Sequence, residues 1–452
     1  MGLQVVSVGC AAPGLNALGK SVGPDEFIDV LETVYANGSE RRLGMLEKAV
    51  AKRVARKAAN GTGIQKRDLL IADEVGLKAT YLAALSLQEA LKSISMTPGE
   101  LDGIVFCSNT PDCVHPSNGL IIADLFGINL IDKKYATVDI ACISVEEAIT
   151  TYASNWIQTG ACKTIAIIAG DVNSRLRLPL NDRESYLFGD QFVTIILKKS
   201  DEGGVFSTGV SADTAMAKSF VHRCSYSADS VPLAINQLCG AANDRGLGTL
   251  GIWESQLWPW LLNKVVEEAQ ISIDEKTVVI GPQATKKVHE EGLSNYRNRT
   301  KHDIEKNVLV PSSYMHGNTG AAAFPLAFYE GRKSGKIRSD TKVIMIFAGV
   351  GGMFGSLVID PSAKETNRAL KLKIDSEFPN SVNLIRQRAN EFKTAVPHFR
   401  ESLYFRLNPK TELTNANFDL FGKYLSQINV MLSSAVQTDK PADNTIYEVS
   451  KT

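Results

Sequence analysis

The chain has 452 residues and a formal net charge of zero, because 49 lysines and arginines balance 49 aspartates and glutamates. Hydrophobic residues make up 44% of it, which excludes a disordered chain and allows a large core. The balanced charge gives no indication of binding to nucleic acid or to an anionic membrane surface. At roughly 100–200 residues per domain, the length predicts two or three domains, or one large duplicated domain.

The first half of the chain alternates between strand and helix patterns. Its runs Ile104–Phe106 and Ile165–Ile168 are apolar without alternation, which is typical of strands covered on both faces. The elements expected here are, in chain order, a strand at Leu3–Val8, a helix at Glu74–Ser93, a strand at Gly103–Cys107, a helix at Ser117–Phe126, a strand at Ala136–Cys142, a helix at Val145–Thr159, and strands at Thr164–Ala169 and Phe192–Leu197. Outside this series, Ser21–Gly61 contains a charged helical segment, Glu40–Lys57.

The second half repeats the same order of elements. It is expected to contain a strand at Val205–Ala212, a helix at Trp253–Ala269, a strand at Thr277–Ile280, a helix at Ala284–Gly292, a short strand at Val308–Pro311, a helix at Gly320–Lys333, and strands at Val343–Ala348 and Ser356–Ile359. Two copies of one unit predict a duplicated fold with a pseudo-two-fold axis, whereas a single α/β sheet is the alternative.

We therefore divide the chain into residues 1–200, residues 201–362 and an extension, residues 363–452. The extension has helical patches at Ser381–Thr394 and Asn417–Val436 and then a polar end, and its aromatic residues indicate packing onto the rest of the protein.

The seven cysteines form no CxxC pair, which favours reduced thiols over disulfides. The first residues have no basic segment followed by a long apolar run, so we expect no signal peptide. No apolar run reaches the ~18 residues that span a membrane. These features together predict a cytoplasmic protein.

Several short motifs occur along the chain in a fixed order. They are Thr62-Gly63-Ile64 with Lys66-Arg67, Thr110-Pro111 to Ser117, Leu125-Phe126-Gly127-Ile128, Asp139-Ile140-Ala141-Cys142, Leu187-Phe188-Gly189-Asp190, His316-Gly317-Asn318-Thr319-Gly320 and Phe347–Ser356. This order resembles the β-ketoacyl-ACP synthase III family of the thiolase superfamily. Each motif is weak alone, but their joint order over roughly residues 1–360 is specific.

This resemblance implies a five-layered αβαβα fold, and a homodimer or a heterodimer with a related chain. It also implies an acyltransferase or condensing enzyme that takes an acyl group from a CoA or acyl-carrier-protein thioester, in fatty-acid-like or specialised-metabolite biosynthesis. No cofactor or metal is implied beyond that substrate. Two alternatives stay open, namely a catalytically degenerate partner subunit of a heteromeric complex and an acyl-thioester-binding protein.

Cys142 is the first candidate for the nucleophile. The family places its reactive cysteine where a strand ends and a helix begins, because a helix N-terminus favours a thiolate. Counting from Asp139 by the family's spacing reaches Ser144 instead, so Ser144 is a second candidate, and a buried structural thiol at Cys142 is a third possibility. Glu146 and Glu147 follow, and we expect them on a solvated face.

The family's second catalytic group is a histidine in a Pro-His-Gln-Ala-Asn motif. Here the motif is Gly281-Pro282-Gln283-Ala284-Thr285, so Pro282 stands at the histidine position and cannot transfer a proton. His289 lies about 10 Å further along a helix and is a poor substitute. The family's asparagine is present as Asn318, which can polarise a thioester carbonyl, and His316 is a candidate for an alternative base.

Other residues are weaker candidates. Arg175, Arg177 and Arg223 are possible contacts of the pantetheine arm, whereas the tryptophans at 253, 258 and 260 do not match the family's pattern. The glycines of Gly349–Gly355 lie between two expected strands and not between a strand and a helix, so we reject dinucleotide binding.

Overall fold

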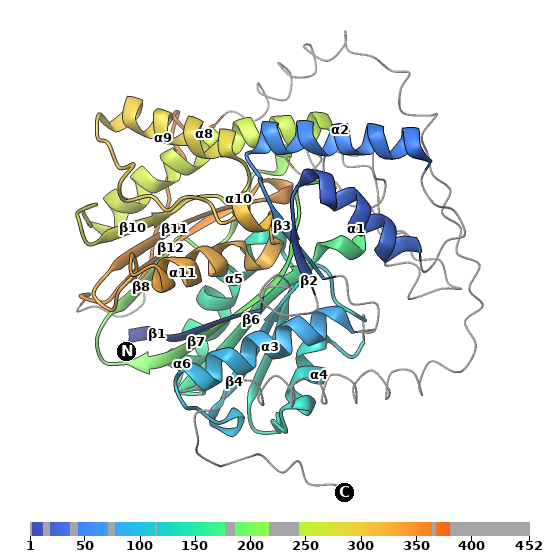
Figure 1. The fold of residues 1–452 in the computed structure, drawn as a ribbon. Helices are drawn as coiled ribbons and strands as arrows, with labels where there is room; N and C mark the ends of the chain where they lie inside the picture. Colours follow the sequence, from blue (N-terminus) through green and yellow to red (C-terminus); the bar gives the residue numbers. More distant parts are fainter. Residues whose placement is uncertain are drawn as a thin grey trace, which may run out of the picture.

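The fold has five alternating layers of helices and sheets (Figure 1). A computed structural model describes residues 2–11, 19–36, 44–70, 77–113, 115–176, 186–216, 244–363 and 368–379. Figure 1 shows two sheets, with helices between them and on their outer faces. The five-layered αβαβα arrangement expected from the resemblance is therefore confirmed.

The first sheet has five strands, all from residues 2–200. In spatial order they are β1 (Gly2–Ala11), β7 (Asp190–Ser200), β6 (Thr164–Val172), β4 (Gly103–Cys107) and β5 (Lys134–Val138). β4 is parallel to β5 and β6, whereas β7 is antiparallel to β1 and β6. Every residue of β4 and β6 is buried, as their unbroken apolar runs predict.

Two helices, α3 (Lys78–Ser93) and α4 (Asn118–Leu125), cover the outer face of the first sheet. Gly9 of β1 lies so close to α3 that a Cβ there would overlap the backbone of Ala90, so a glycine permits this close packing.

The second sheet takes its strands from residues 204–369. In spatial order they are β10 (Thr277–Ile280), β11 (Lys342–Gly349), β12 (Met353–Asp360), β8 (Gly204–Ser207) and β13 (Arg368–Ala369), and β9 (Ser211–Ala212) also pairs with β12. The helices α8 (Asp244–Ala269) and α9 (Lys286–Thr300) cover its outer face, beside α2 (Met45–Thr62). The boundary near residue 200 stays a prediction, and the separation of the strands into two sheets supports it.

The middle layer lies between the two sheets. It contains α11 (Ala323–Lys333) and the helical run of α5 (Ser144–Glu147), a π-helical turn (Ala148–Ala153) and α6 (Ser154–Gln158). Buried apolar residues of this layer and of both sheets form one core cluster, in which the ring centroids of Phe324 and Phe347 lie 4.2 Å apart. The helix α5 of the middle layer therefore starts, at Ser144, in the interior of the protein.

Four smaller elements differ from the sequence predictions. Pro24–Ala36 forms α1, which was not predicted, and Gly19–Val22 (β2) pairs with Arg67–Leu70 (β3). The short strand predicted at Val308–Pro311 was wrong, because only a single bridge joins Val308 to Val279 before Pro311 and the helical turn α10 (Ser313–His316).

The described part of the extension packs against the second half. Trp260 of α8 donates a hydrogen bond from Nε1 to the Asp375 carboxylate at 2.9 Å, and its ring lies 4.9 Å from that of Phe378. The helical patches predicted at Ser381–Thr394 and Asn417–Val436 lie outside the described residues. Within the described part of the chain, no helix is both long and apolar enough to cross a membrane.

Candidate active site

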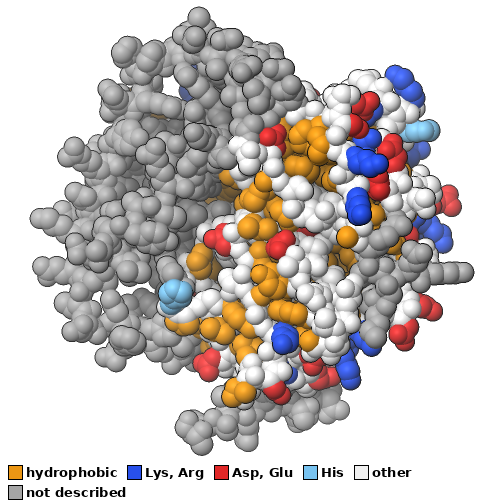
Figure 2. Space-filling view, turned by 180° about the vertical axis from the view of Figure 1, so that it is seen from behind, with side chains coloured by type: hydrophobic (Ala, Val, Ile, Leu, Met, Phe, Trp, Pro, Cys, Tyr) orange, Lys and Arg blue, Asp and Glu red, His pale blue; other side chains and the backbone are white. Residues whose placement is uncertain are grey.

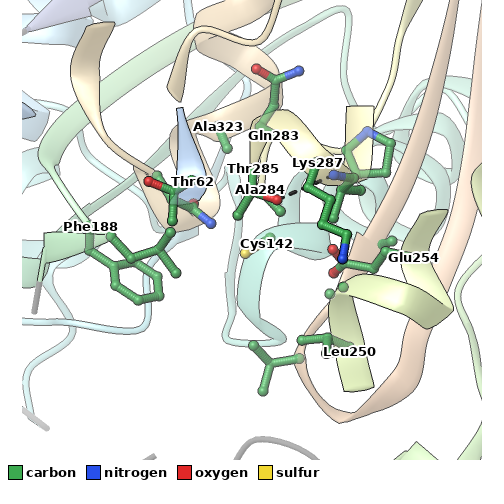
Figure 3. A pocket seen from close by; sticks show the side chains of 18 of the residues that line it. Thr62, Cys142, Phe188, Leu250, Glu254, Gln283, Ala284, Thr285, Lys287 and Ala323 are labelled. Atoms are coloured by element: carbon green, nitrogen blue, oxygen red, sulfur yellow. Dashed lines mark hydrogen bonds between the residues drawn. The ribbon is translucent and has the colours of Figure 1, made fainter. Parts of the chain in front are cut away.

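A cavity of about 420 Å³ lies where the two halves meet. Its wall is formed by α2, α8, the segment before α9, the turn after β5, the Asn318 loop and the end of β11. Cys142, Asn318 and Pro282 all line this cavity, as does the acidic residue Glu254 (Figure 3). The structure thus brings Cys142 and Asn318 to one cavity, although they lie 176 positions apart in the chain.

A tight turn after β5 places Cys142 in the cavity. Ala141 has a φ of +57°, a left-handed conformation that a non-glycine residue adopts only when its surroundings hold it there. Asn109 supplies part of this support, because its Oδ1 accepts a hydrogen bond from the Ala141 N–H at 2.9 Å. Cys142 follows in a short 3₁₀ turn, is half-buried, and directly precedes the helical run that starts at Ser144. A helix N-terminus at this position favours a thiolate and offers N–H groups to an oxyanion.

Ser144 has a different environment. It is fully buried, and its Oγ donates to the Ala141 carbonyl at 2.8 Å and accepts from the Ile140 N–H at 3.1 Å. Ser144 does not line the cavity. Its hydroxyl therefore closes the turn that presents Cys142, and this geometry favours Cys142 over Ser144 as the nucleophile.

Glu146 is buried, so the prediction of a solvated face was wrong for this residue. Its carboxylate accepts a hydrogen bond from Ser207 Oγ at 3.3 Å and lies against Gly355, where a Cβ would overlap it. Burial raises the pKa of Glu146 well above its usual range. The reason is that the helix turns this position toward the second sheet, so Glu146 joins the two halves instead of facing solvent.

The Asn318 loop is fixed by the backbone and by its own side chain. The Asn318 N–H donates to the Leu187 carbonyl at 2.8 Å, and the Gly189 N–H donates to the Asn318 carbonyl at 3.0 Å. Asn318 Oδ1 accepts from the Gly320 N–H at 3.0 Å, and no described residue accepts from its Nδ2. The amide is therefore oriented so that its NH₂ group is the part left to donate to a carbonyl in the cavity.

Asp171 connects the cysteine turn to the Asn318 loop. Its Oδ2 accepts from Asn109 Nδ2 at 2.9 Å and from the Ala321 N–H at 2.8 Å. Burial raises the pKa of Asp171 to about 6, although these hydrogen bonds act in the opposite direction. Sequence reasoning missed Asp171 and Asn109, and the signal was a polar residue at the end of each of two neighbouring buried strands.

Pro282 occupies the cavity wall, so the position of the family's histidine carries no titratable group. Thr285, at the family's second asparagine position, instead caps α9, because its Oγ1 accepts from the Val288 N–H at 3.3 Å. His289 is half-buried and does not line the cavity. Neither Pro282 nor His289 is therefore placed to transfer a proton in the cavity.

His316 does not line the cavity either. Its Nδ1 lies 2.7 Å from an Asp68 oxygen and its Nε2 lies 2.8 Å from a Glu330 oxygen. Burial opposes the charged imidazolium, but the two carboxylates outweigh it and raise the pKa of His316 to about 9. A doubly paired imidazolium has no free nitrogen to accept a proton, so the geometry does not support His316 as the base.

Glu254 is a titratable group of the cavity lining that sequence reasoning missed. It lies on α8, is 5% exposed, and burial raises its pKa to about 8. Among the described residues it has no hydrogen-bond or ion-pair partner. The signal in the sequence was a single acid within the apolar stretch Gly251–Trp260.

The weaker candidates fall elsewhere. Trp253, Trp258 and Trp260 are buried in the core. The side chain of Arg175, and Arg177 and Arg223 entirely, lie outside the described residues. The glycine-rich segment makes the turn between β11 and β12, as expected for a strand–turn–strand connection.

Comparisons with known proteins agree with this fold. The family described as 3-oxoacyl-[acyl-carrier-protein (ACP)] synthase III C terminal matches residues 266–360. The chain is 26% identical over 310 residues to the β-ketoacyl-[acyl-carrier-protein] synthase III of Clostridium acetobutylicum, covering 66% of this chain and 87% of that protein.

Solved structures of the same class share the fold. The 3-oxoacyl-[acyl-carrier-protein] synthase III of Aquifex aeolicus VF5 superposes with a TM-score of 0.60 at 20% identity, covering 79% of this chain and all of that one. The priming β-ketosynthase of the R1128 polyketide biosynthetic pathway also gives 0.60 at 20% identity, covering 80% and 97% of the two chains. The chain is thus similar to 3-oxoacyl-ACP synthases III in the sequence of its residues 266–360 and in its overall fold.

Proposed function

We propose that this protein is an acyltransferase whose Cys142 takes an acyl group from a CoA or acyl-carrier-protein thioester. The observation that carries the proposal is the convergence of Cys142 and Asn318 on one cavity, with Cys142 at the start of a helix. The names of the relatives, which are 3-oxoacyl-ACP synthases and a polyketide priming ketosynthase, support the class of reaction and a place in fatty-acid-like or specialised-metabolite biosynthesis.

The cavity has the character expected for a pantetheine thioester. Most of its lining residues are apolar, whereas the exposed side chains of Lys57 and Lys287 line it as well. An apolar channel with lysines suits an acyl chain on a carrier that ends in phosphate groups. The proposed reaction uses that thioester as a substrate and no further cofactor.

In the proposed first step, the Cys142 thiolate attacks the thioester carbonyl. The Nδ2 group of Asn318 donates to the carbonyl oxygen, and the N–H groups at the helix start stabilise the developing negative charge. The CoA or carrier thiol then leaves, and the acyl group stays on Cys142. Because Pro282 replaces the histidine, decarboxylative condensation by a His–Asn pair is not supported, and transfer of the acyl group to another nucleophile fits the site better.

A second candidate function is that of a catalytically silent subunit paired with an active relative. The absence of a base at Pro282 favours it, whereas the ordered Asn318 loop does not. Two observations support pairing: β5 is the last strand of the first described sheet, and Figure 2 shows hydrophobic side chains along the middle of the described rear face. Homodimer, heterodimer and a cytoplasmic location stay predictions.

Intact-mass measurement after incubation with a series of acyl-CoAs and acyl-carrier proteins tests the proposal. We expect the mass of one acyl group to be added to the wild type and to the control variant Cys113→Ala, whose half-buried thiol lies outside the cavity. We expect no addition in Cys142→Ala. An adduct lost in Ser144→Ala and kept in Cys142→Ala would move the nucleophile, and no adduct with any donor would favour the silent subunit.

A further inference from the structure

Glu254 is the acidic side chain that the proposed first step leaves without a role. α8 carries it in the cavity wall, where Figure 3 shows it together with Lys287 on one side of Cys142, and Thr62 and Phe188 on the other side. The adjacent Trp253 is fully buried in the core. Of these two neighbouring residues of α8, Trp253 packs in the core and Glu254 lines the cavity.

The environment of Glu254 is costly for a carboxyl group. It is 5% exposed, yet among the described residues it has no hydrogen-bond or ion-pair partner. Its neighbour Ser255, by contrast, is also buried but donates to the Ile252 carbonyl at 2.9 Å. Burying a polar group without a partner lowers stability, so such a group inside a cavity indicates that a bound molecule supplies the partner.

The charged groups around the cavity do not neutralise Glu254. Lys57 and Lys287 line the same cavity, but both side chains are exposed, and Lys287 pairs with Glu291 at 3.5 Å. The remaining titratable group of the lining is Cys142. Within the described part of the wall, Glu254 and Cys142 are thus the titratable groups that are buried or half-buried.

We infer that Glu254 is the proton acceptor of the second step, and that the acyl acceptor is therefore a protic nucleophile, a hydroxyl or an amine. This inference rests on the proposed acylation of Cys142. In the step, the acceptor O–H or N–H gives its proton to the Glu254 carboxylate while its oxygen or nitrogen bonds to the acyl carbon. The C–S bond then breaks, Cys142 leaves as the thiolate, and it recovers the proton from Glu254.

The chemistry of the cavity favours this acceptor over a carbanion. A carbanion made by loss of CO₂ needs hydrogen-bond donors that hold the enolate oxygen, and Pro282 has removed the family's donor at that place. An O–H or N–H nucleophile instead needs a base. Burial places the pKa of Glu254 at about 8, close to the working range in which a carboxylate is an effective general base.

The test separates the two steps. The protein is first acetylated on Cys142 with acetyl-CoA and freed of excess donor, and the loss of the adduct is followed by intact mass from pH 6 to pH 9. The acceptors are water, n-butanol and n-butylamine, with malonyl-CoA as the source of a carbanion. The variants are Glu254→Gln, Glu254→Asp and the control Glu267→Gln, whose exposed side chain lies on the same helix.

We expect wild type and Glu267→Gln to lose the acetyl group at a rate that rises with pH through about 8, with ester or amide as product. Glu254→Gln is expected to form the adduct normally and to lose it at least ~100-fold more slowly, without the pH dependence, and Glu254→Asp to recover part of the rate. The inference is overturned if Glu254→Gln loses the adduct as fast as wild type, or if malonyl-CoA alone gives product in both proteins. Failure of the wild type to form an adduct would instead count against the proposed function itself.

Discussion

Replacing Glu254 by glutamine should make the protein more stable at neutral and alkaline pH. Burial raises the pKa of this carboxyl from 4.5 to about 8, so the folded protein holds the Glu254 proton more tightly than the unfolded chain does. The contribution of the protonated form to stability is fully present below pH 4.5 and is lost as the pH rises through 8. At about 1.36 kcal/mol per pKa unit, that interval corresponds to a loss of up to about 5 kcal/mol.

Glutamine keeps the shape of the side chain but does not titrate, so the variant should escape this loss. Between pH 4.5 and pH 7 the difference in unfolding free energy should shift in favour of the variant by about 3 kcal/mol, and by up to about 5 kcal/mol at pH 8.5. Denaturant unfolding of wild type, Glu254→Gln and Glu267→Gln at these three pH values measures it. A difference between wild type and Glu254→Gln that does not change with pH would refute the buried, unpaired carboxyl on which the reasoning depends.

Three further predictions follow from the same contacts. Gly355→Ala should lower the free energy of unfolding by about 1–3 kcal/mol, because the new methyl group meets the carboxylate of Glu146; a melting temperature equal to that of wild type would contradict the close contact. His316→Gln should lower the free energy of unfolding by about 3 kcal/mol at pH 6 and by little above pH 9.5, because the stabilisation by the imidazolium is lost as the pH rises through its raised pKa of about 9. Denaturant titrations at the two pH values measure this difference, and an equal loss at both would refute the reasoning. Asp171→Asn should slow acylation of Cys142 by roughly 100-fold while the far-ultraviolet circular dichroism stays unchanged, because the turn and the Asn318 loop lose their common acceptor; unaltered acylation would show that Asp171 does not position them.

Strands were predicted correctly where a short apolar run alone determines where the strand begins and ends. Gly103–Cys107 and Thr277–Ile280 have the predicted ends, because each is a short apolar run that is buried on both faces. The strand predicted to reach Cys142 ends at Val138 instead. In the turn that follows, Asn109 accepts a hydrogen bond from the Ala141 N–H, and local sequence patterns do not show such a long-range contact.

The candidate site was predictable to a similar extent. Cys142, Asn318 and Pro282 were singled out from motifs, and the structure brings them to one cavity. Glu146 and Glu254 were not understood, because an acid on an apolar helix faces solvent, core or cavity according to how the helix is turned against its sheet. The orientation of the helix depends on how the two halves of the chain pack together, and the spacing of residues along the sequence does not show that packing.

The central claim is that Cys142 is the residue that carries the acyl group. Peptide mapping by tandem mass spectrometry, after incubation of the wild type with acyl-CoA and rapid acid quenching, tests it most directly. The account predicts the acyl mass on the peptide that contains Cys142, with fragment ions that assign it to that sulfur. Acyl mass on Ser144, on another cysteine, or on no peptide at all would contradict the account.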